Sequence, residues 1–288
     1  MKTKILVTGA NGQLGKTISD LYLHNEDDLE FVFVSKKELD ISDKAKLTTY
    51  FEKNSFDYCI NCAAYTNVEQ AEESIEDAFK VNAEAVGHLA ESCSNSNTIL
   101  IHISTDYVFD GKKRTPYSET DETSPINQYG HSKLEGEKLI AKHFSEYFII
   151  RTSWLYSKHP KNFVTTIVSK IKENRDLTIT TSQEGTPTSC VELAKFIHHL
   201  IVSQNKQFGI YHFSAKGQAS WFDFALVITE NFQAYDRSKV KPVDSFKSKA
   251  ERPEYSVMNN NKTQKIYHHQ NDWKADVAEV VKTILSNN

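Results

Sequence analysis

Hydrophobic and polar positions up to residue 150 follow two alternating patterns. Short apolar runs bounded by polar residues predict strands at 5–7, 31–34, 58–61, 99–103 and 148–150. Amphipathic stretches between these runs predict helices at 13–24, 43–53, 74–93 and 128–142. The nearly continuous apolar run at 99–103 suits a parallel strand that is covered on both faces. Strands that alternate with helices in this way predict an α/β fold with a doubly wound parallel sheet.

The regularity weakens after Arg151. Helices are still expected there, at 163–172, 191–202, 221–231 and 276–285, together with a strand at 210–213. The sequence contains neither an internal repeat nor a low-complexity segment. We therefore expect a smaller lobe in this half of the chain, with some segments that return to the main sheet.

Three glycines stand between the first predicted strand and the first predicted helix, as Gly9-x-x-Gly12-x-x-Gly15. In dinucleotide-binding turns the first glycine permits the tight turn, the second admits the pyrophosphate and the third lets the helix pack on the strand. The amide groups at the start of the helix then face the phosphates. The sequence therefore predicts a dinucleotide-binding Rossmann domain over residues 1–155 and a mainly substrate-binding lobe over 156–288. Other cofactor contacts are expected from the same turn, at Asn11, Gln13 and Leu14.

The end of the second strand bears on which dinucleotide binds. NAD sites usually place an acidic residue there, whereas this strand runs into Ser35 and Lys36, followed by a second lysine. A hydroxyl and ammonium groups suit a 2′-phosphate, which favours NADPH. NADH stays an alternative, because a solvated lysine pair is also common. Further cofactor contacts are expected near the adenine and after the third strand, at Asp40, Ile41, Ala63, Ala64 and Tyr65.

A tyrosine and a lysine four residues apart, Tyr129 and Lys133, would lie on one face of a helix. A nearby cation lowers the pKa of a phenol, which makes it usable as a general acid or base. Thr105 ends the fourth strand, at the edge where open α/β sheets bind ligands. We therefore expect Thr105, Tyr129 and Lys133 to be catalytic. Tyr235 and Lys239 have the same spacing but no such strand-end partner, so we expect that tyrosine at the surface.

Several motifs together resemble the extended short-chain dehydrogenase/reductase family, and within it the reductases of dTDP-linked keto sugars. They are the glycine turn, the segments 61–66 (NCAAYT) and 104–111 (STDYVFDG), and Tyr129-x-x-x-Lys133. Segments 151–154 (RTSW), 185–188 (GTPT) and 252–253 (RP) extend the similarity over nearly the whole chain. The segment 104–111 is the most specific of these motifs, because Tyr-x-x-x-Lys is shared by a much wider superfamily.

The resemblance implies reduction of the C4 ketone of dTDP-6-deoxy-L-lyxo-4-hexulose, with NAD(P)H as the hydride source. It implies that Tyr129 protonates the developing alkoxide, Thr105 hydrogen-bonds it, and Lys133 depresses the tyrosine pKa and holds the nicotinamide ribose. Two rival hypotheses stay open. One is a non-catalytic dinucleotide-binding regulator, like the β-subunit of methionine adenosyltransferase. The other is a sibling reductase or epimerase that makes another 6-deoxyhexose.

Three further residues are candidates for substrate binding. Asp106 would orient Thr105 or meet a sugar hydroxyl, unless it only caps the turn that follows. Trp154 resembles the family residue that packs on the sugar, with a core aromatic as the alternative. Arg252 suits the diphosphate, because its planar guanidinium matches phosphate oxygens, and a surface ion pair is the alternative.

Some relatives join a dimer through Mg²⁺ held by glutamates, but Thr17 stands at one of these positions here, and the second falls near Val191, next to Glu192. We therefore expect no required metal, and either a monomer or a homodimer.

Composition and charge exclude several other classes. Hydrophobic residues make up 39% and charged residues 25%, as in ordinary globular proteins. A net charge of −4 without a basic run argues against nucleic acid or acidic membranes as partners. No apolar run approaches the roughly 20 residues that span a bilayer, and no secretory signal pattern is present. With 4 irregularly spaced cysteines, the sequence predicts a cytoplasmic protein without a disulfide framework.

Overall fold

The computed structural model describes residues 2–24, 28–268 and 271–286. Its central sheet is 6-stranded and parallel throughout, in the order β10-β5-β4-β3-β1-β2. The strands are β1 (Thr3–Thr8), β2 (Leu29–Val34), β3 (Tyr58–Asn61), β4 (Ile99–Thr105), β5 (Tyr147–Thr152) and β10 (Gly209–His212). The prediction of a doubly wound parallel sheet is confirmed. Because the order reverses between β1 and β3, the carboxyl ends of these two strands border the crevice where such sheets bind ligands.

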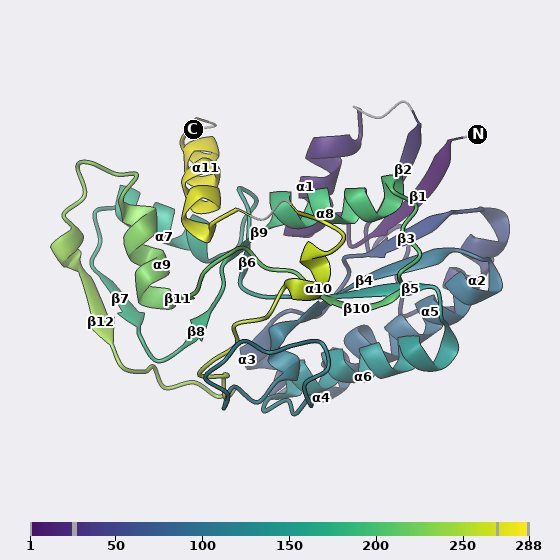
Figure 1. The fold of residues 1–288 in the computed structure, drawn as a ribbon, viewed down its shortest axis with the longest axis horizontal. Coiled ribbons are helices and arrows are strands. Elements are labelled where there is room, and N and C mark those ends of the chain that lie inside the picture. The colour runs from purple at the N-terminus through teal and green to yellow at the C-terminus, as the bar shows by residue number, and fades with distance from the viewer. Residues whose placement is uncertain (1, 25–27, 269–270, 287–288) are drawn as a thin grey trace.

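Helices cover both faces of this sheet (Figure 1). One face carries α1 (Gln13–Tyr22) and α8 (Cys190–Val202), and the other carries α2 (Lys44–Lys53), α5 (Ala85–Asn95) and α6 (Gln128–His143). Strand β1 shows why both faces need cover. Ile5 and Val7 pack into the core under α1 and α8, whereas Leu6 packs into the core on the opposite side. All three side chains are fully buried, as the near-continuous apolar pattern of a parallel strand requires.

The long helix predicted over 74–93 is confirmed as a continuous helical segment over 75–95. A separate short helix, α3 (Val68–Ala71), precedes it, and the segment runs from α4 (Ile75–Phe79) through a π-helical turn (Lys80–Glu84) into α5. This turn holds Asn82 against α6 so closely that a Cβ on Gly136 would lie 2.1 Å from the Asn82 carbonyl oxygen. The Asn82 side-chain amide also bonds the backbone N–H and C=O of Tyr65, at 2.8 and 2.9 Å. The π-helical turn thus ties the loop after β3 to α6.

The rest of the chain builds the smaller lobe at the left of Figure 1. Its elements are β6 (Leu155–Tyr156), α7 (Phe163–Lys172), β7 (Leu177–Thr180), β8 (Glu184–Gly185), β9 (Thr188–Ser189), β11 (Ala219–Ser220), α9 (Trp221–Thr229), β12 (Val240–Val243) and α11 (Trp273–Ser286). The short helix α10 (Asn261–Gln264) lies against β10 of the central sheet instead, where the Lys262 amine donates to the Ile210 carbonyl oxygen at 2.7 Å. The helices α7, α9 and α11 enclose a hydrophobic core of their own. Helix α8 and strand β10 belong to the sheet domain instead, and the division at residue 155 stays a prediction.

The surface position predicted for Tyr235 is wrong. Only 7% of this residue is exposed, because its ring packs into the lobe core beside β12. Its hydroxyl donates a hydrogen bond to the Arg175 carbonyl oxygen at 2.7 Å. Strands β7 and β12 pair in parallel although they lie far apart in the sequence, and this pairing covers the ring. Lys239 lies in a 3-10 turn that begins after Tyr235, so the two residues do not share a helix face.

Across the described residues, none of the helices combines the length and the apolar character that crossing a bilayer demands.

Candidate active site

The glycine turn has the geometry of a pyrophosphate site. Gly9 has a φ of +66°, and a Cβ on it would lie 2.6 Å from the Ala63 backbone nitrogen. A Cβ on Gly15 would lie 2.7 Å from the Gly9 carbonyl oxygen, so only glycine lets α1 start this close to β1. Gly12 caps α1 without a side chain, and the first turn carries no acidic residue. The amides at the start of α1 are therefore open to an anion.

A cavity of about 340 Å³ lies beside this turn, between the ends of β1 and β3. The predicted cofactor residues that line it are Gly9, Asn11, Gly12, Lys36, Asp40, Ile41, Ala63, Ala64 and Tyr65. Its Lys36 side chain is 78% exposed, with the amine 3.7 Å from an Asp40 carboxylate oxygen. Ser35 does not line this cavity. Its amide and hydroxyl both donate to Glu38, which lowers the pKa of that carboxyl group.

A second cavity, of about 500 Å³, opens between the sheet edge and the lobe. It brings together most of the remaining predicted residues, which are Gln13, Leu14, Thr105, Asp106, Tyr129, Lys133 and Trp154. Asn11 and Gly12 line both cavities, which places the two hollows on either side of the glycine turn. Gln13 also fastens the turn to the lobe, because its side-chain amide donates to the Leu155 carbonyl oxygen at 3.2 Å.

Tyr129 lies on the first turn of α6, which begins where the Asn127 side chain accepts a hydrogen bond from the Gly130 amide at 2.8 Å. Burial raises the pKa of Tyr129 to about 12, although a hydrogen bond with Thr105 opposes this shift. The lowered pKa expected for Tyr129 from the nearby Lys133 is therefore wrong for the protein alone, because burial dominates. At neutral pH the phenol is protonated, as a proton donor must be. The ring meets Tyr107 edge to face, with 5.8 Å between the centroids.

Lys133 lies one helical turn after Tyr129 and is only 2% exposed. Burial lowers its pKa to about 8, and the nearby Glu137 carboxylate opposes this shift. Its amine donates to the Ile103 carbonyl oxygen at 2.6 Å and lies 3.2 Å from the His102 ring nitrogen Nε2. The lysine is therefore an ammonium at neutral pH, held at the floor of the cavity.

Asp106 is buried directly behind Thr105. Its carboxylate accepts a hydrogen bond from the Thr105 hydroxyl at 3.0 Å. Burial raises the pKa of Asp106 to about 6, even though hydrogen bonds from Ser256 and Thr105 pull it down. This contact favours the orienting role for Asp106, since it fixes the rotation of the Thr105 hydroxyl.

Trp154 has a φ of +47°, and its ring lines the cavity. It stacks on Trp221 with 3.7 Å between centroids and 6° between the planes. A Cβ on Gly185 would lie 2.6 Å from this ring, so the glycine is needed to seat it. Sequence reasoning missed Trp221 and Lys161, which line the same cavity from the lobe. The two indoles cover each other's inner faces, and both residues line the cavity.

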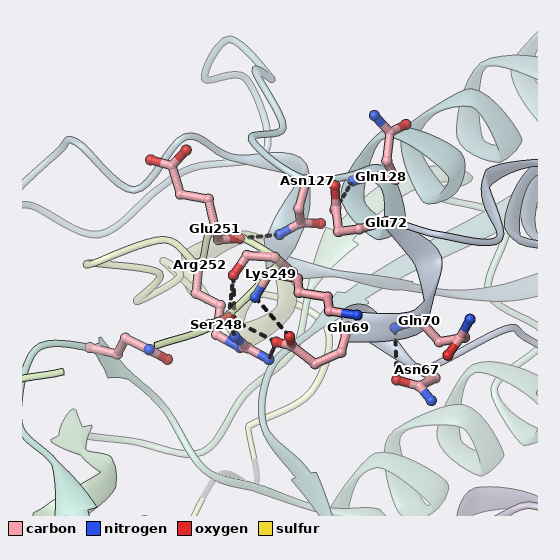
Figure 2. A network of polar contacts seen from close by, with 12 residues as sticks. Asn67, Glu69, Gln70, Glu72, Asn127, Gln128, Ser248, Lys249, Glu251 and Arg252 are labelled. Atoms are coloured by element: carbon pink, nitrogen blue, oxygen red, sulfur yellow. Dashed lines mark hydrogen bonds and ion pairs between the residues drawn. The ribbon is translucent and has the colours of Figure 1, made fainter. Parts of the chain in front are cut away.

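Arg252 does not line the cavity, but it hydrogen-bonds Tyr107, which does. Figure 2 shows its guanidinium turned toward Glu69 of α3, with Ser248 beside it. The Lys249 amide donates to the same carboxylate at 3.0 Å. Burial raises the pKa of Glu69, but these partners outweigh it and lower the pKa to about 2. The arginine therefore reaches the edge of the site while paired with an anion.

The positions linked to metal in some relatives hold other contacts here. The Thr17 hydroxyl donates to the Gln13 carbonyl oxygen at 2.7 Å, within α1. Glu192, next to Val191, pairs with Lys195 at 2.7 Å. Within the described part of the chain, no cluster of three or more histidine, cysteine or acidic side chains could hold a metal ion.

A parallel sheet with a glycine turn, and a threonine, tyrosine and lysine gathered in one adjoining cavity, define an extended short-chain dehydrogenase/reductase. Comparison with known proteins narrows this class. The family described as "RmlD substrate binding domain" matches residues 3–286, and the chain belongs to this family. The resemblance inferred from the sequence motifs is confirmed.

Individual relatives cover nearly the whole chain. The dTDP-4-dehydrorhamnose reductase of Aggregatibacter actinomycetemcomitans is 35% identical over 96% of this chain and 98% of its own. The dTDP-4-keto-6-deoxy-D-glucose reductase of Streptomyces niveus is 34% identical over 90% and 89%. The crystal structure of dTDP-4-dehydrorhamnose reductase from Bacillus anthracis, in complex with NADP, superposes with a TM-score of 0.93. That enzyme is 34% identical, with 98% of this chain and 100% of the other covered.

Proposed function

We propose that this protein reduces the C4 ketone of dTDP-6-deoxy-L-lyxo-4-hexulose to give dTDP-L-rhamnose, with NADPH as the reductant. The observation that carries the proposal is the gathering of Thr105, Tyr129 and Lys133 in a single cavity beside the glycine turn. Relatives named dTDP-4-dehydrorhamnose reductase support the substrate, and the NADP complex of the Bacillus anthracis enzyme supports the cofactor.

The chain's own residues supply the proton and the charge balance. NADPH, when bound, supplies the hydride that adds to C4. Tyr129 donates its phenolic proton to the oxygen that was the ketone. The single hydrogen of the Thr105 hydroxyl, which Asp106 holds in the protein alone, turns to the same oxygen when substrate binds. Lys133, as an ammonium, stabilises the phenolate that remains. Trp154 and Trp221 bind the sugar through their stacked rings.

The 2′-phosphate of NADPH is proposed to bind at Ser35, Lys36 and the adjoining Lys37, beside the adenine cavity. Replacing both lysines by alanine is expected to weaken NADPH binding roughly three- to tenfold, because exposed ion contacts contribute little each. NADH binding should change less than twofold, since NADH lacks the phosphate. Fluorescence titration with both dinucleotides measures this, and a double variant at Lys44 and Lys46 of α2 is the control. Equal weakening for both dinucleotides would refute the assignment.

Arg252 is proposed to bind the diphosphate of the substrate, exchanging Glu69 for a phosphate oxygen. Arg252→Ala is expected to raise KM for the nucleotide sugar about 10- to 100-fold, which corresponds to one or two charge-assisted hydrogen bonds. The value of kcat should change less than threefold, because the diphosphate lies away from the reacting carbon.

Steady-state kinetics tests the role of Arg252, with Arg114→Ala as the matched control. Arg114 is 65% exposed and also pairs with a glutamate, Glu254, at 2.7 Å. Equal KM values for Arg252→Ala, Arg114→Ala and the unaltered protein would show that Arg252 does not bind the diphosphate.

A sibling reductase is the second candidate, since the Streptomyces niveus relative is named for a different keto sugar. Turnover of dTDP-4-keto-6-deoxy-D-glucose against the 4-keto-L-hexulose separates the two substrates. NMR of the product from the enzymatically prepared 4-keto-L-hexulose then reads the configuration at C4. The rhamno configuration supports the proposal, and the talo configuration refutes it.

We also propose a cytoplasmic location and a monomer or homodimer. The free state of Cys59, Cys62, Cys93 and Cys190 supports a reducing compartment.

A further inference from the structure

His102 lies in the middle of β4, beneath the floor of the catalytic cavity, and is fully buried. Its two ring nitrogens each meet a nitrogen atom of another side chain. Nε2 lies 3.2 Å from the Lys133 amine, and Nδ1 lies 3.0 Å from the Asn61 amide nitrogen. No step of the proposed reaction uses this residue, yet it contacts one of the three catalytic groups directly.

The neighbours of Asn61 determine which ring nitrogen of His102 carries the hydrogen. The Ala63 backbone N–H donates to Asn61 Oδ1 at 3.1 Å, and the Thr8 hydroxyl donates to the same oxygen at 2.7 Å. A backbone N–H can only donate, so the Asn61 amide cannot be turned around. Its NH₂ group therefore donates to His102 Nδ1, which must present a lone pair.

The ring of His102 is also neutral. Burial, together with the nearby Lys133 charge, holds the pKa of His102 well below its usual range. A neutral imidazole with a lone pair on Nδ1 carries its single hydrogen on Nε2. That hydrogen points at the amine of Lys133.

This arrangement acts on the protonation of Lys133. An ammonium group donates hydrogen bonds but cannot accept one. A charged Lys133 therefore cannot accept from the His102 N–H, and the two donors repel each other. A neutral amine has a lone pair that accepts from the same N–H, while it still donates to the Ile103 carbonyl oxygen at 2.6 Å. The fixed ring therefore favours the neutral amine.

We propose that His102 is a positioning residue for Lys133, whose Nε2–H, fixed by Asn61 and Ala63, holds the amine and sets its protonation. The inference rests on the proposed function only for its role in catalysis, because the contacts themselves belong to the protein alone.

Among the groups around Lys133, Glu137, one turn further along α6, acts in the opposite direction and favours the ammonium. Burial raises the pKa of the Cys62 thiol after β3, so it is uncharged at neutral pH and adds nothing to this effect. Tyr129, one turn earlier on α6, is protonated and neutral as well. Among the described neighbours, His102 is thus the fixed hydrogen-bond donor that opposes Glu137.

NMR on the cofactor-free protein tests the contact directly. Selective labelling of lysine side chains follows the titration of Lys133, which should have a pKa near 8. In His102→Gln the side-chain amide can turn its oxygen toward the ammonium. The Lys133 midpoint should then rise by about one pH unit, because a hydrogen bond to the charged form favours it. His212→Gln, which alters a buried histidine of β10, a strand separated from β4 by β5, should leave the midpoint unchanged.

A second measurement needs no variant. Long-range ¹H–¹⁵N spectra of the unaltered protein should show His102 as the Nε2–H tautomer. An Nδ1–H tautomer, or an unchanged Lys133 midpoint in a folded His102→Gln protein, would overturn the proposal.

The catalytic consequence is an alkaline limit on activity. The ammonium form of Lys133 is needed to stabilise the phenolate, so kcat/KM should fall as pH rises through about 8. In His102→Gln this limit should move upward with the NMR midpoint. A protein without turnover in which the midpoint still moves would refute the proposed function and support the role of His102. A protein that turns over substrate, but whose Lys133 midpoint is unchanged in His102→Gln, would support the proposed function and refute the role of His102.

Discussion

Replacing Tyr129 by phenylalanine is expected to lower turnover by roughly two to four orders of magnitude, the usual range for a positioned acid. The substitution removes the proton donor but keeps the ring and its edge-to-face contact with Tyr107. The Thr105 hydroxyl loses its contact with the phenol but keeps its hydrogen bonds with Asp106 and with the Tyr107 backbone N–H. The expected loss is therefore a loss of chemistry in a folded protein.

Rates of NADPH oxidation and a parallel titration of NADPH binding measure this effect. Tyr235→Phe is the matched control, because Tyr235 begins the second Tyr-x-x-x-Lys pair and its hydroxyl bonds only backbone, at Arg175. Its turnover should stay within about twofold of the unaltered protein, as for a change remote from the reacting atoms. A loss of less than tenfold in Tyr129→Phe would show that another group donates the proton.

Removing the buried carboxylate of Glu137 is expected to lower the free energy of unfolding by about 3–5 kcal/mol. A guanidinium nitrogen of Arg151 lies 2.7 Å from a Glu137 carboxylate oxygen, and each side chain is only 3% exposed. The Ser104 hydroxyl donates to the same group, directly before Thr105 in the chain. Glu137→Leu therefore leaves an unpaired charge in the core beneath the site.

Denaturant unfolding of single and double variants checks this prediction. Glu137→Leu combined with Arg151→Met should regain most of the lost stability, because an apolar pair of similar size replaces a desolvated ion pair. Independent, additive losses in the two single variants would contradict an energetically coupled pair.

Local patterns predicted the parts of the protein that depend on residues close in sequence. The glycine turn, the helix that carries Tyr129 and Lys133, and the strand that ends at Thr105 were all placed from spacing alone. These features work because each is fixed by backbone geometry within a few residues. The doubly wound sheet followed from the alternation of short apolar runs and amphipathic stretches.

Those local patterns could not predict contacts between segments that lie far apart in the sequence. Trp221 reaches the cavity because it stacks on Trp154, and no local signal marks that meeting. Tyr235 is buried because β7 pairs with β12, two strands of only 4 residues each. The pairing of Arg252 with Glu69 likewise joins α3 to the loop that follows β12 (Figure 2).

The π-helical turn Lys80–Glu84 shows a third kind of limit. Residues 74–93 carry the pattern of one amphipathic helix, and that pattern contains no break. The π-helical turn lies where Asn82 closely approaches Gly136, which is a tertiary contact. The sequence pattern thus predicted the helix but not the widened turn inside it.

The most direct test of the central claim is NADPH consumption by the purified protein on addition of dTDP-6-deoxy-L-lyxo-4-hexulose. The reductase account predicts oxidation of one NADPH for each sugar reduced, with consumption by Tyr129→Phe slowed by roughly two to four orders of magnitude. NADPH that binds tightly but is not oxidised, with the substrate shown to be intact, would contradict the account and favour a non-catalytic regulator.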